Sequence, residues 1–90
     1  MKRQSLTISG KVQGVFYRKS AAAQARIIGI TGFVKNMPDG NVYAEAQGTE
    51  NQLNAFLSWC QRGPERARVD NVDVKEMDLI TGETGFEVRY

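Results

Sequence analysis

The order in which helix-like and strand-like patterns follow one another is the feature that most constrains the fold of this sequence. A first helix is predicted over residues 18–28, where Gly29 ends it. A second helix is predicted from the capping box formed by Thr49 and Gln52 as far as Gly63. The apolar positions at helical spacing are Ala21, Ala25 and Ile28 in the first helix and Leu53, Phe56, Leu57 and Cys60 in the second.

Alternating polar and apolar residues predict five strands around these helices. They run from Leu6 toward Val12, over residues 30–36 and 41–47, through Val72 and Val74, and from Phe86 to Tyr90 after a turn at 81–85. The second and third strands form a hairpin, because Pro38-Asp39-Gly40 between them is typical of a tight turn. The order is therefore βαββαβ with one extra strand.

With right-handed crossovers, this order predicts an α+β fold, the ferredoxin-like sandwich. Its antiparallel sheet carries both helices on one face, and a short fifth strand is added at the C-terminus. Ninety residues suit a single domain, residues 1–90, and leave no room for a second. Many unrelated activities use this fold, so function has to be sought in a site.

Composition removes several kinds of chemistry. The chain has no His and one Cys, which excludes His-based acids, bases and zinc sites, Ser-His-Asp or Cys-His pairs, and an intramolecular disulfide. Cys60 continues the apolar stripe of the second helix and is expected in the core. No segment has the length of a membrane span and the start lacks the pattern of a signal peptide, so a cytoplasmic location is expected.

Charge is distributed unevenly along the chain. Residues 1–38 contain seven basic and no acidic side chains, whereas residues 39–90 contain five basic and ten acidic ones. Two interpretations follow. The basic side chains are solvated and have their partners in the acidic part, or they form an anion-handling surface. We expect Arg18 to handle an anion and the other six basic side chains to be solvated.

A glycine-containing loop, Gly10 to Arg18, lies between the first strand and the first helix. Backbone N–H groups in a tight turn, followed by the free N–H groups of a helix start, form a concave cluster of dipoles that suits phosphate. The planar fork of Arg18 can bind two phosphate oxygens, and Gly14 allows a close approach of the backbone. The spacing matches neither a Walker A loop nor a dinucleotide fingerprint. The residues alone leave an anion site and a purely structural turn both open.

Two segments resemble the signatures of the acylphosphatase family. The first is Gly10-X-Val12-Gln13-Gly14-Val15-X-Tyr17-Arg18, in which the X positions are unconstrained and are occupied here by Lys11 and Phe16. The second is Gly32-Phe33-Val34-Lys35-Asn36, with Gly40, Val42 and Gly48 downstream. The resemblance spans the whole chain. It implies an enzyme that hydrolyses the carboxyl-phosphate bond of acyl phosphates without a metal or cofactor.

The resemblance also implies roles for individual residues. Arg18 would bind the phosphate together with the backbone N–H groups of Gln13, Gly14, Val15, Phe16, Tyr17 and Arg18, and Asn36 would position the attacking water. The side chains of Val12, Val15 and Phe16 are expected to form walls of the loop. The terminal carboxylate at Tyr90 is a further candidate, as a group that orients Arg18. Without the resemblance, Asn36 is better explained as a turn residue beside Met37 and Pro38.

The partners follow from this interpretation. We expect a small-molecule acyl phosphate as substrate, inorganic phosphate as product and competitive inhibitor, no nucleic acid or membrane partner, and a monomer. One alternative is a non-catalytic domain that senses phosphate or an acyl phosphate. Another is a ferredoxin-like RNA-binding module, for which Tyr43 would be the stacking platform. Glu45 on the same face as Tyr43 would repel RNA, so we do not favour it.

Overall fold

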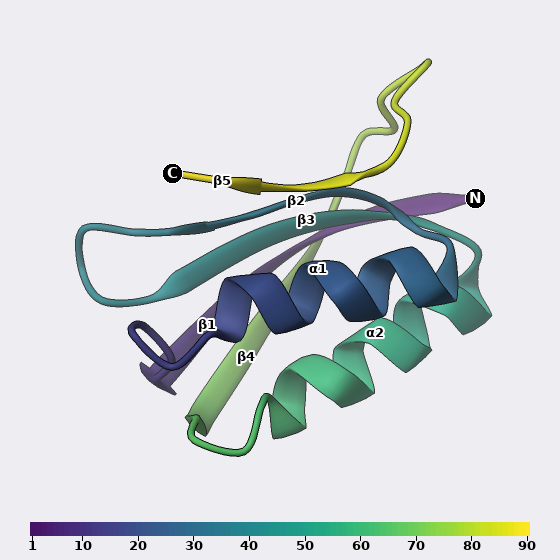
Figure 1. Cartoon of the computed structure of the whole chain (residues 1–90). Coiled ribbons are helices and arrows are strands. Elements are labelled where there is room, and N and C mark those ends of the chain that lie inside the picture. The colour runs from purple at the N-terminus through teal and green to yellow at the C-terminus, as the bar shows by residue number, and fades with distance from the viewer.

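The computed structural model describes residues 1–90, and seven elements follow one another along the chain (Figure 1). The helices are α1 (Tyr17–Ile28) and α2 (Glu50–Arg62). The strands are β1 (Lys2–Lys11), β2 (Thr31–Asn36), β3 (Val42–Gly48), β4 (Arg68–Met77) and β5 (Phe86–Arg89). Every predicted element is present. The main difference is that β1 and β4 each extend over ten residues, further than their alternating patterns indicated.

The strands form one sheet in the order β4-β1-β3-β2-β5, and both helices cover the same face of it (Figure 1). The first four strands in this order pair antiparallel, whereas β5 pairs parallel to β2, with Gly32 opposite Phe86 and Lys35 opposite Arg89. The predicted ferredoxin-like sandwich with a short fifth strand is therefore confirmed. Because β5 lies along β2, the end of the chain runs beside the strand that ends in Asn36. Neither helix has the length and apolar character needed to cross a membrane.

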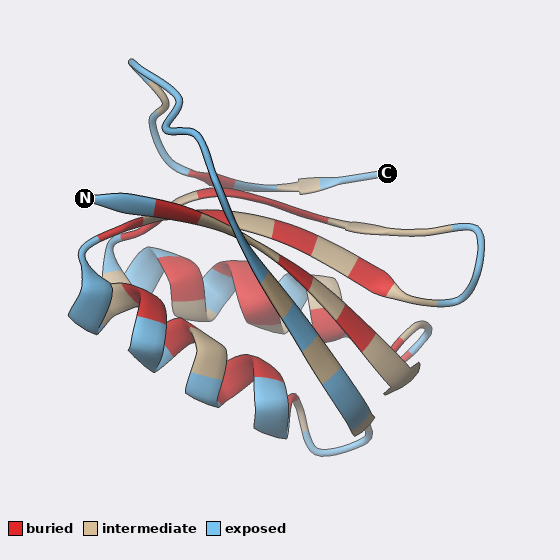
Figure 2. Cartoon of the chain, turned by 180° about the vertical axis from the view of Figure 1, so that it is seen from behind, coloured by how far each residue is buried: buried red, intermediate tan, exposed pale blue.

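The core lies between the helices and the sheet, where the buried positions of both layers face each other (Figure 2). In β3, Val42, Ala44 and Ala46 point into this core and are fully buried. Helix α2 starts as predicted, because the Gln52 N–H donates to Thr49 Oγ1 at 3.2 Å and the Thr49 N–H donates to Gln52 Oε1 at 2.9 Å.

An ion-pair cluster on the other face of the sheet corrects one expectation. Arg3, expected to be solvated, is 1% exposed. Its guanidinium donates to Glu45 Oε1 at 2.8 Å and to Glu83 Oε1 at 2.7 Å. Burial disfavours the charged form of Arg3, but the two carboxylates outweigh that cost and raise its pKa. The cluster fixes the segment between β4 and β5 against the sheet, and Gln47 adds to this by hydrogen bonding to both backbone groups of Ile80.

Candidate active site

The loop between β1 and α1 presents a row of unused backbone donors. The N–H groups of Gln13, Gly14, Val15 and Phe16 donate to no acceptor in the protein. The first backbone hydrogen bond of α1 runs from the Ser20 N–H to the Phe16 oxygen, at 3.1 Å. The free donors of the loop therefore continue into the free N–H groups of the helix start. Together they give this corner of the molecule the partial positive charge that favours an anion.

Two left-handed residues shape the loop. Gly14 has φ 74° and Phe16 has φ 62°, and Phe16 is the only residue other than glycine with a positive φ. Left-handed residues alternating with ordinary ones turn successive N–H groups toward a common point, which is the geometry of an anion-binding nest. A Cβ on Gly14 would meet no atom within 4 Å, so the backbone conformation, not the available space, favours glycine there.

Arg18 lies on the first turn of α1, and β5 holds its side chain in place. Arg18 Nη1 donates to the backbone oxygen of Arg89 at 3.0 Å, and the guanidinium carbon lies 4.6 Å from the centroid of the Tyr90 ring. No ion pair joins Arg18 to any carboxylate. The contacts that orient Arg18 are therefore a backbone carbonyl and an aromatic ring, where the sequence had suggested the terminal carboxylate. Arg18 keeps donors that are not engaged with the protein.

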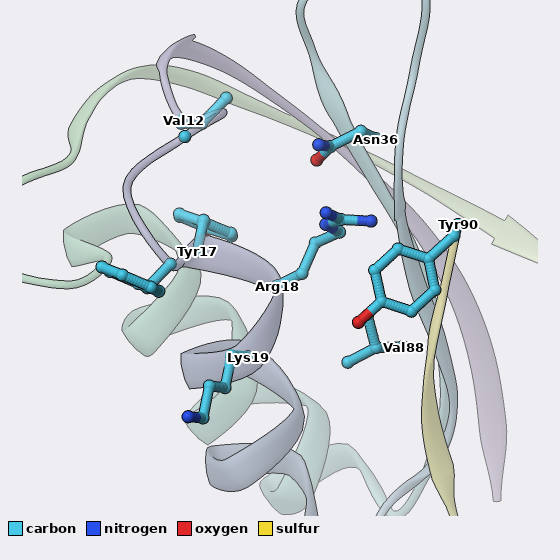
Figure 3. Close-up of a pocket in the computed structure, with 9 residues that line it drawn as sticks. Val12, Tyr17, Arg18, Lys19, Asn36, Val88 and Tyr90 are labelled. Carbon is cyan, nitrogen blue, oxygen red and sulfur yellow. The ribbon is translucent and has the colours of Figure 1, made fainter.

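Asn36, at the end of β2, faces Arg18 across a cleft of about 620 Å³ (Figure 3). The residues that line the cleft are Val12, Gly14, Phe16, Tyr17, Arg18, Lys19, Asn36, Val88 and Tyr90. Asn36 Oδ1 is buried, yet no protein group donates a hydrogen bond to it. A buried carbonyl oxygen without a donor costs about 1–3 kcal/mol, which makes this atom a ready acceptor for a bound molecule.

Gln13 has a side-chain role that the sequence did not reveal. Its Nε2 donates to the backbone oxygen of Met37 at 2.8 Å and to that of Asn41 at 2.9 Å. The loop that follows β1 is thereby fastened to the β2–β3 turn, directly after Asn36. The one signal in the sequence was the presence of Gln13 inside the first signature.

The remaining predicted site residues divide between cleft and core. Val15 is buried in the core, so only its backbone is available to a ligand. Tyr17 lines the cleft but is 2% exposed, and its hydroxyl donates to the backbone oxygen of Cys60 at 2.7 Å. Burial raises the pKa of the Tyr17 hydroxyl, and it raises the pKa of the Cys60 thiol to about 12. Neither group is poised as an acid or a nucleophile.

The sheet face proposed for stacking RNA bases is already occupied. The rings of Phe33 and Tyr43 pack against each other with centroids 6.1 Å apart, and the guanidinium of Arg89 covers the Phe33 ring at 3.8 Å. The Tyr43 hydroxyl donates to Glu45 Oε2 at 2.8 Å. These contacts leave no bare aromatic platform, and Glu45 adds negative charge beside Tyr43.

Comparison with known proteins agrees with this geometry. The family model described as Acylphosphatase matches residues 4–88. A protein of Methylococcus capsulatus named Acylphosphatase is 51% identical over 98% of this chain and 96% of its own length. The crystal structure of acylphosphatase from Bacillus subtilis superposes with a TM-score of 0.95 at 31% identity, covering 100% of both chains. An acylphosphatase structure from Coxiella burnetii gives a TM-score of 0.91 at 36% identity, covering 98% of this chain and 92% of that one.

Proposed function

The chain belongs to the acylphosphatase family and hydrolyses acyl phosphates, and we propose that Arg18 and Asn36 divide the work of catalysis between them. Arg18 and the backbone N–H groups of residues 13–18 hold the phosphate. Asn36 orients the attacking water. The observation that carries this proposal is the buried, unpaired Asn36 Oδ1, which faces the guanidinium of Arg18 across one cleft (Figure 3).

The phosphate role of Arg18 is supported by what already restrains its side chain. One donor is used on the Arg89 oxygen and one face of the guanidinium lies over the Tyr90 ring, so the group is aimed before substrate arrives. A planar guanidinium with free donors binds two oxygens of one phosphate. The row of unengaged N–H groups from Gln13 to Phe16 supplies further donors for the equatorial oxygens, where charge spreads during phosphoryl transfer.

The water role of Asn36 is supported by the two functions of a carboxamide. Its Oδ1 accepts from a water O–H, while its Nδ2 donates to a phosphate oxygen or to the water oxygen. Asp at this position would repel the phosphate. When the enzyme holds the water at a fixed distance from phosphorus, the two no longer have to meet by diffusion in the correct orientation. This positioning accounts for a large part of the rate acceleration that a small enzyme can provide.

The reaction needs no further catalytic group from the protein. An acyl phosphate leaves as a carboxylate whose conjugate acid has a pKa of about 4, so no general acid is needed to protonate it. The proton of the attacking water passes to a phosphate oxygen of the substrate. A chain without His is therefore sufficient for this chemistry.

We further propose that residues 1–90 act as one domain, because the lining of the cleft comes from both ends of the chain, from Val12 to Tyr90. We also propose that the protein acts as a monomer. Inorganic phosphate, the product, is expected to occupy the same donors and to inhibit competitively. The buried free thiol of Cys60 suits the reducing cytoplasm, which we propose as the location.

The test is hydrolysis of benzoyl phosphate in the presence of EDTA, followed by the loss of absorbance, with inorganic phosphate as inhibitor. Arg18→Gln is expected to abolish both turnover and phosphate binding. Asn36→Ala is expected to lower kcat by more than about 100-fold and to leave the phosphate inhibition or binding constant nearly unchanged. Arg66→Gln and Asn54→Ala, exposed positions outside the cleft, are the matched controls.

Three results would overturn the proposal. Near-normal turnover by either cleft variant would remove its residue from the mechanism. Loss of activity on adding EDTA would contradict the proposed metal-free reaction. Phosphate binding without any turnover by the unsubstituted protein would favour the alternative of a phosphate-sensing domain.

A further inference from the structure

The groups that the cleft offers to a substrate suit its phosphate and the attacking water. The free N–H groups from Gln13 to Phe16 and the guanidinium of Arg18 suit phosphate oxygens. The unpaired Asn36 Oδ1 suits the water. None of these contacts depends on a carbonyl carbon beyond the leaving oxygen. The groups proposed for catalysis therefore do not by themselves restrict the cleft to acyl phosphates.

The cleft holds no buried group that is free to protonate a leaving oxygen. No carboxyl side chain lines it, and the chain has no His. The Tyr17 hydroxyl donates its proton to the Cys60 oxygen at 2.7 Å, and burial raises the pKa of this hydroxyl. An acid catalyst has to lie within hydrogen-bond reach of the atom that it protonates, and Tyr17 is already engaged elsewhere.

Two proton donors remain at the exposed rim of the cleft, the Lys19 ammonium and the Tyr90 hydroxyl. Figure 3 shows the ammonium pointing away from the guanidinium of Arg18. The contact of Tyr90 with that guanidinium is made by its ring. Neither donor is placed as an acid, so a leaving group departs from phosphorus with its electron pair and without a proton.

A group that leaves without a proton has to be stable as an anion. A carboxylate meets this condition and the phenolate of a strongly acidic phenol meets it too, whereas an ordinary phenolate or an alkoxide does not. Resting on the proposed roles of Arg18 and Asn36, we propose that the same cleft also hydrolyses phosphate monoesters of strongly acidic phenols. The acidity of the leaving group, and not the presence of a carbonyl, decides which phosphates this protein cleaves.

The reaction balances without any further reactant. The water oxygen forms a bond to phosphorus, and the bond between phosphorus and the phenol oxygen breaks with its electron pair on that oxygen. One proton of the water passes to a phosphate oxygen, so the dianionic ester and water give a phenolate and dihydrogen phosphate. The cleft of about 620 Å³ lies within the range of small-molecule sites and has room for the whole ester.

The experiment compares kcat/KM for three esters whose phenols differ in acidity. The phenol of 2,4-dinitrophenyl phosphate is about as acidic as a carboxylic acid, that of para-nitrophenyl phosphate is weaker, and that of phenyl phosphate is as weak as a tyrosine side chain. The dinitrophenyl ester is expected to reach a kcat/KM within about 10-fold of that for acetyl phosphate. The phenyl ester is expected to be slower than the dinitrophenyl ester by at least about 100- to 10,000-fold, the factor that a general acid would have supplied.

Variants show whether one cleft carries out both reactions. Arg18→Gln and Asn36→Ala are expected to lower hydrolysis of the dinitrophenyl ester in the same proportion as that of acetyl phosphate, whereas Arg66→Gln retains both activities. Inorganic phosphate is expected to inhibit both reactions with one inhibition constant. The double variant Lys19→Met/Tyr90→Phe removes both exposed donors and is expected to leave the ratio between the phenyl and dinitrophenyl esters unchanged.

The two proposals fail in different ways. A protein that hydrolyses acetyl phosphate but not the dinitrophenyl ester would overturn the further activity and leave the proposed function intact. Similar rates on all three esters, or a selective loss of the phenyl ester in the double variant, would reveal a general acid and overturn it too. Failure to hydrolyse both acetyl phosphate and the dinitrophenyl ester would overturn the proposed function together with the further activity.

Discussion

Gln13 Nε2 donates to the backbone oxygen of Met37 at 2.8 Å and so ties the β1–α1 loop, the proposed phosphate cradle, to the turn that begins directly after Asn36. The same nitrogen donates to Asn41 at 2.9 Å, on the other side of that turn. Both acceptors have a second donor, since Gly40 donates to Met37 and Met37 donates to Asn41. The Gln13 amide is therefore needed less for satisfying the hydrogen-bond acceptors of the turn than for fixing the distance between the β1–α1 loop and Asn36.

Gln13→Leu is expected to lower kcat/KM on benzoyl phosphate by about 10-fold or more, because a small misplacement of positioned groups is costly in rate. The free energy of unfolding should fall by only about 1 kcal/mol, since the two acceptors keep their backbone donors. Enzyme kinetics and urea denaturation measure the two effects. Gln24→Leu on α1, whose amide makes no hydrogen bond, is the control. If the free energy of unfolding fell by as much as the activation free energy calculated from kcat/KM rose, Gln13 would have a merely structural role.

Removing the Tyr90 ring tests how Arg18 is aimed. Tyr90→Ala is expected to weaken inorganic phosphate binding by about 2- to 5-fold, because an exposed cation–π contact contributes about 0.5–1 kcal/mol. Tyr90→Phe keeps the ring and should bind phosphate normally. Titration calorimetry with phosphate avoids any effect on the acyl group. Unchanged affinity in Tyr90→Ala would leave the Arg89 carbonyl as the sole support of Arg18.

The Arg3 cluster predicts a pH-dependent stability. Burial alone would raise the pKa of the Glu83 carboxyl, but its hydrogen bonds and the positive charges of Arg3 and Arg89 together outweigh burial and lower that pKa below its value in the unfolded chain. The folded state therefore binds this proton less tightly than the unfolded state, so the stabilisation is complete above the ordinary pKa of a glutamate. It is lost as the pH falls through the lowered pKa of the folded state.

Glu83→Gln is accordingly expected to lower the free energy of unfolding by about 1–3 kcal/mol at pH 7, and the difference from the unsubstituted protein should shrink toward acid pH. Urea denaturation at a series of pH values from 7 to about 3 measures this. Asp70→Asn, which breaks an exposed ion pair with Arg68, is the control and should cost about 0–1 kcal/mol. A difference that stays constant over the whole pH range would contradict the lowered pKa.

The Cys60 thiol should be inert in the folded protein. It is fully buried, and burial raises its pKa to about 12, so almost no thiolate exists at pH 8. A chromogenic disulfide reagent is expected to leave the native protein unlabelled and to label one thiol per chain in guanidinium chloride. Rapid labelling of the native state would show that α2 opens locally.

Local patterns were sufficient to predict most of the architecture. The capping box at Thr49 and the helical stripe ending at Cys60 each involve residues that are close in sequence, so both can be recognised from the sequence alone. The parallel pairing of β5 with β2 was not, because nothing local in Phe86 to Arg89 specifies its neighbour. The lengths of β1 and β4 were also underestimated. Their outer residues lie on an edge or on the open face of the sheet, where the apolar alternation that marks a strand is weak.

In the site, too, local sequence patterns predicted some features, whereas features that depend on contacts between distant residues were missed. Arg18 and Asn36 were predicted from two signatures, and the structure brings both into one cleft. The side-chain role of Gln13 and the support that Arg89 gives to Arg18 depend on contacts between residues 24 and 71 positions apart, respectively. The burial of Arg3 was missed for a related reason, since its carboxylate partners lie 42 and 80 residues away.

Because β5 pairs with β2 beside the cleft, catalytic activity is expected only after the last strand has docked on the sheet. Trp59 packs against the Tyr17 ring at 5.4 Å between centroids, so its fluorescence follows the docking of α2 on α1. The cleft also needs Val88 and Tyr90, which are in place only when β5 pairs with β2. Gly32 and Phe86 of that pairing lie further apart in sequence than Tyr17 and Trp59 do, so loop closure delays it more. Turnover should therefore return during refolding no sooner than the Trp59 signal, and a chain in which β5 is undocked would have native helices and an incomplete cleft.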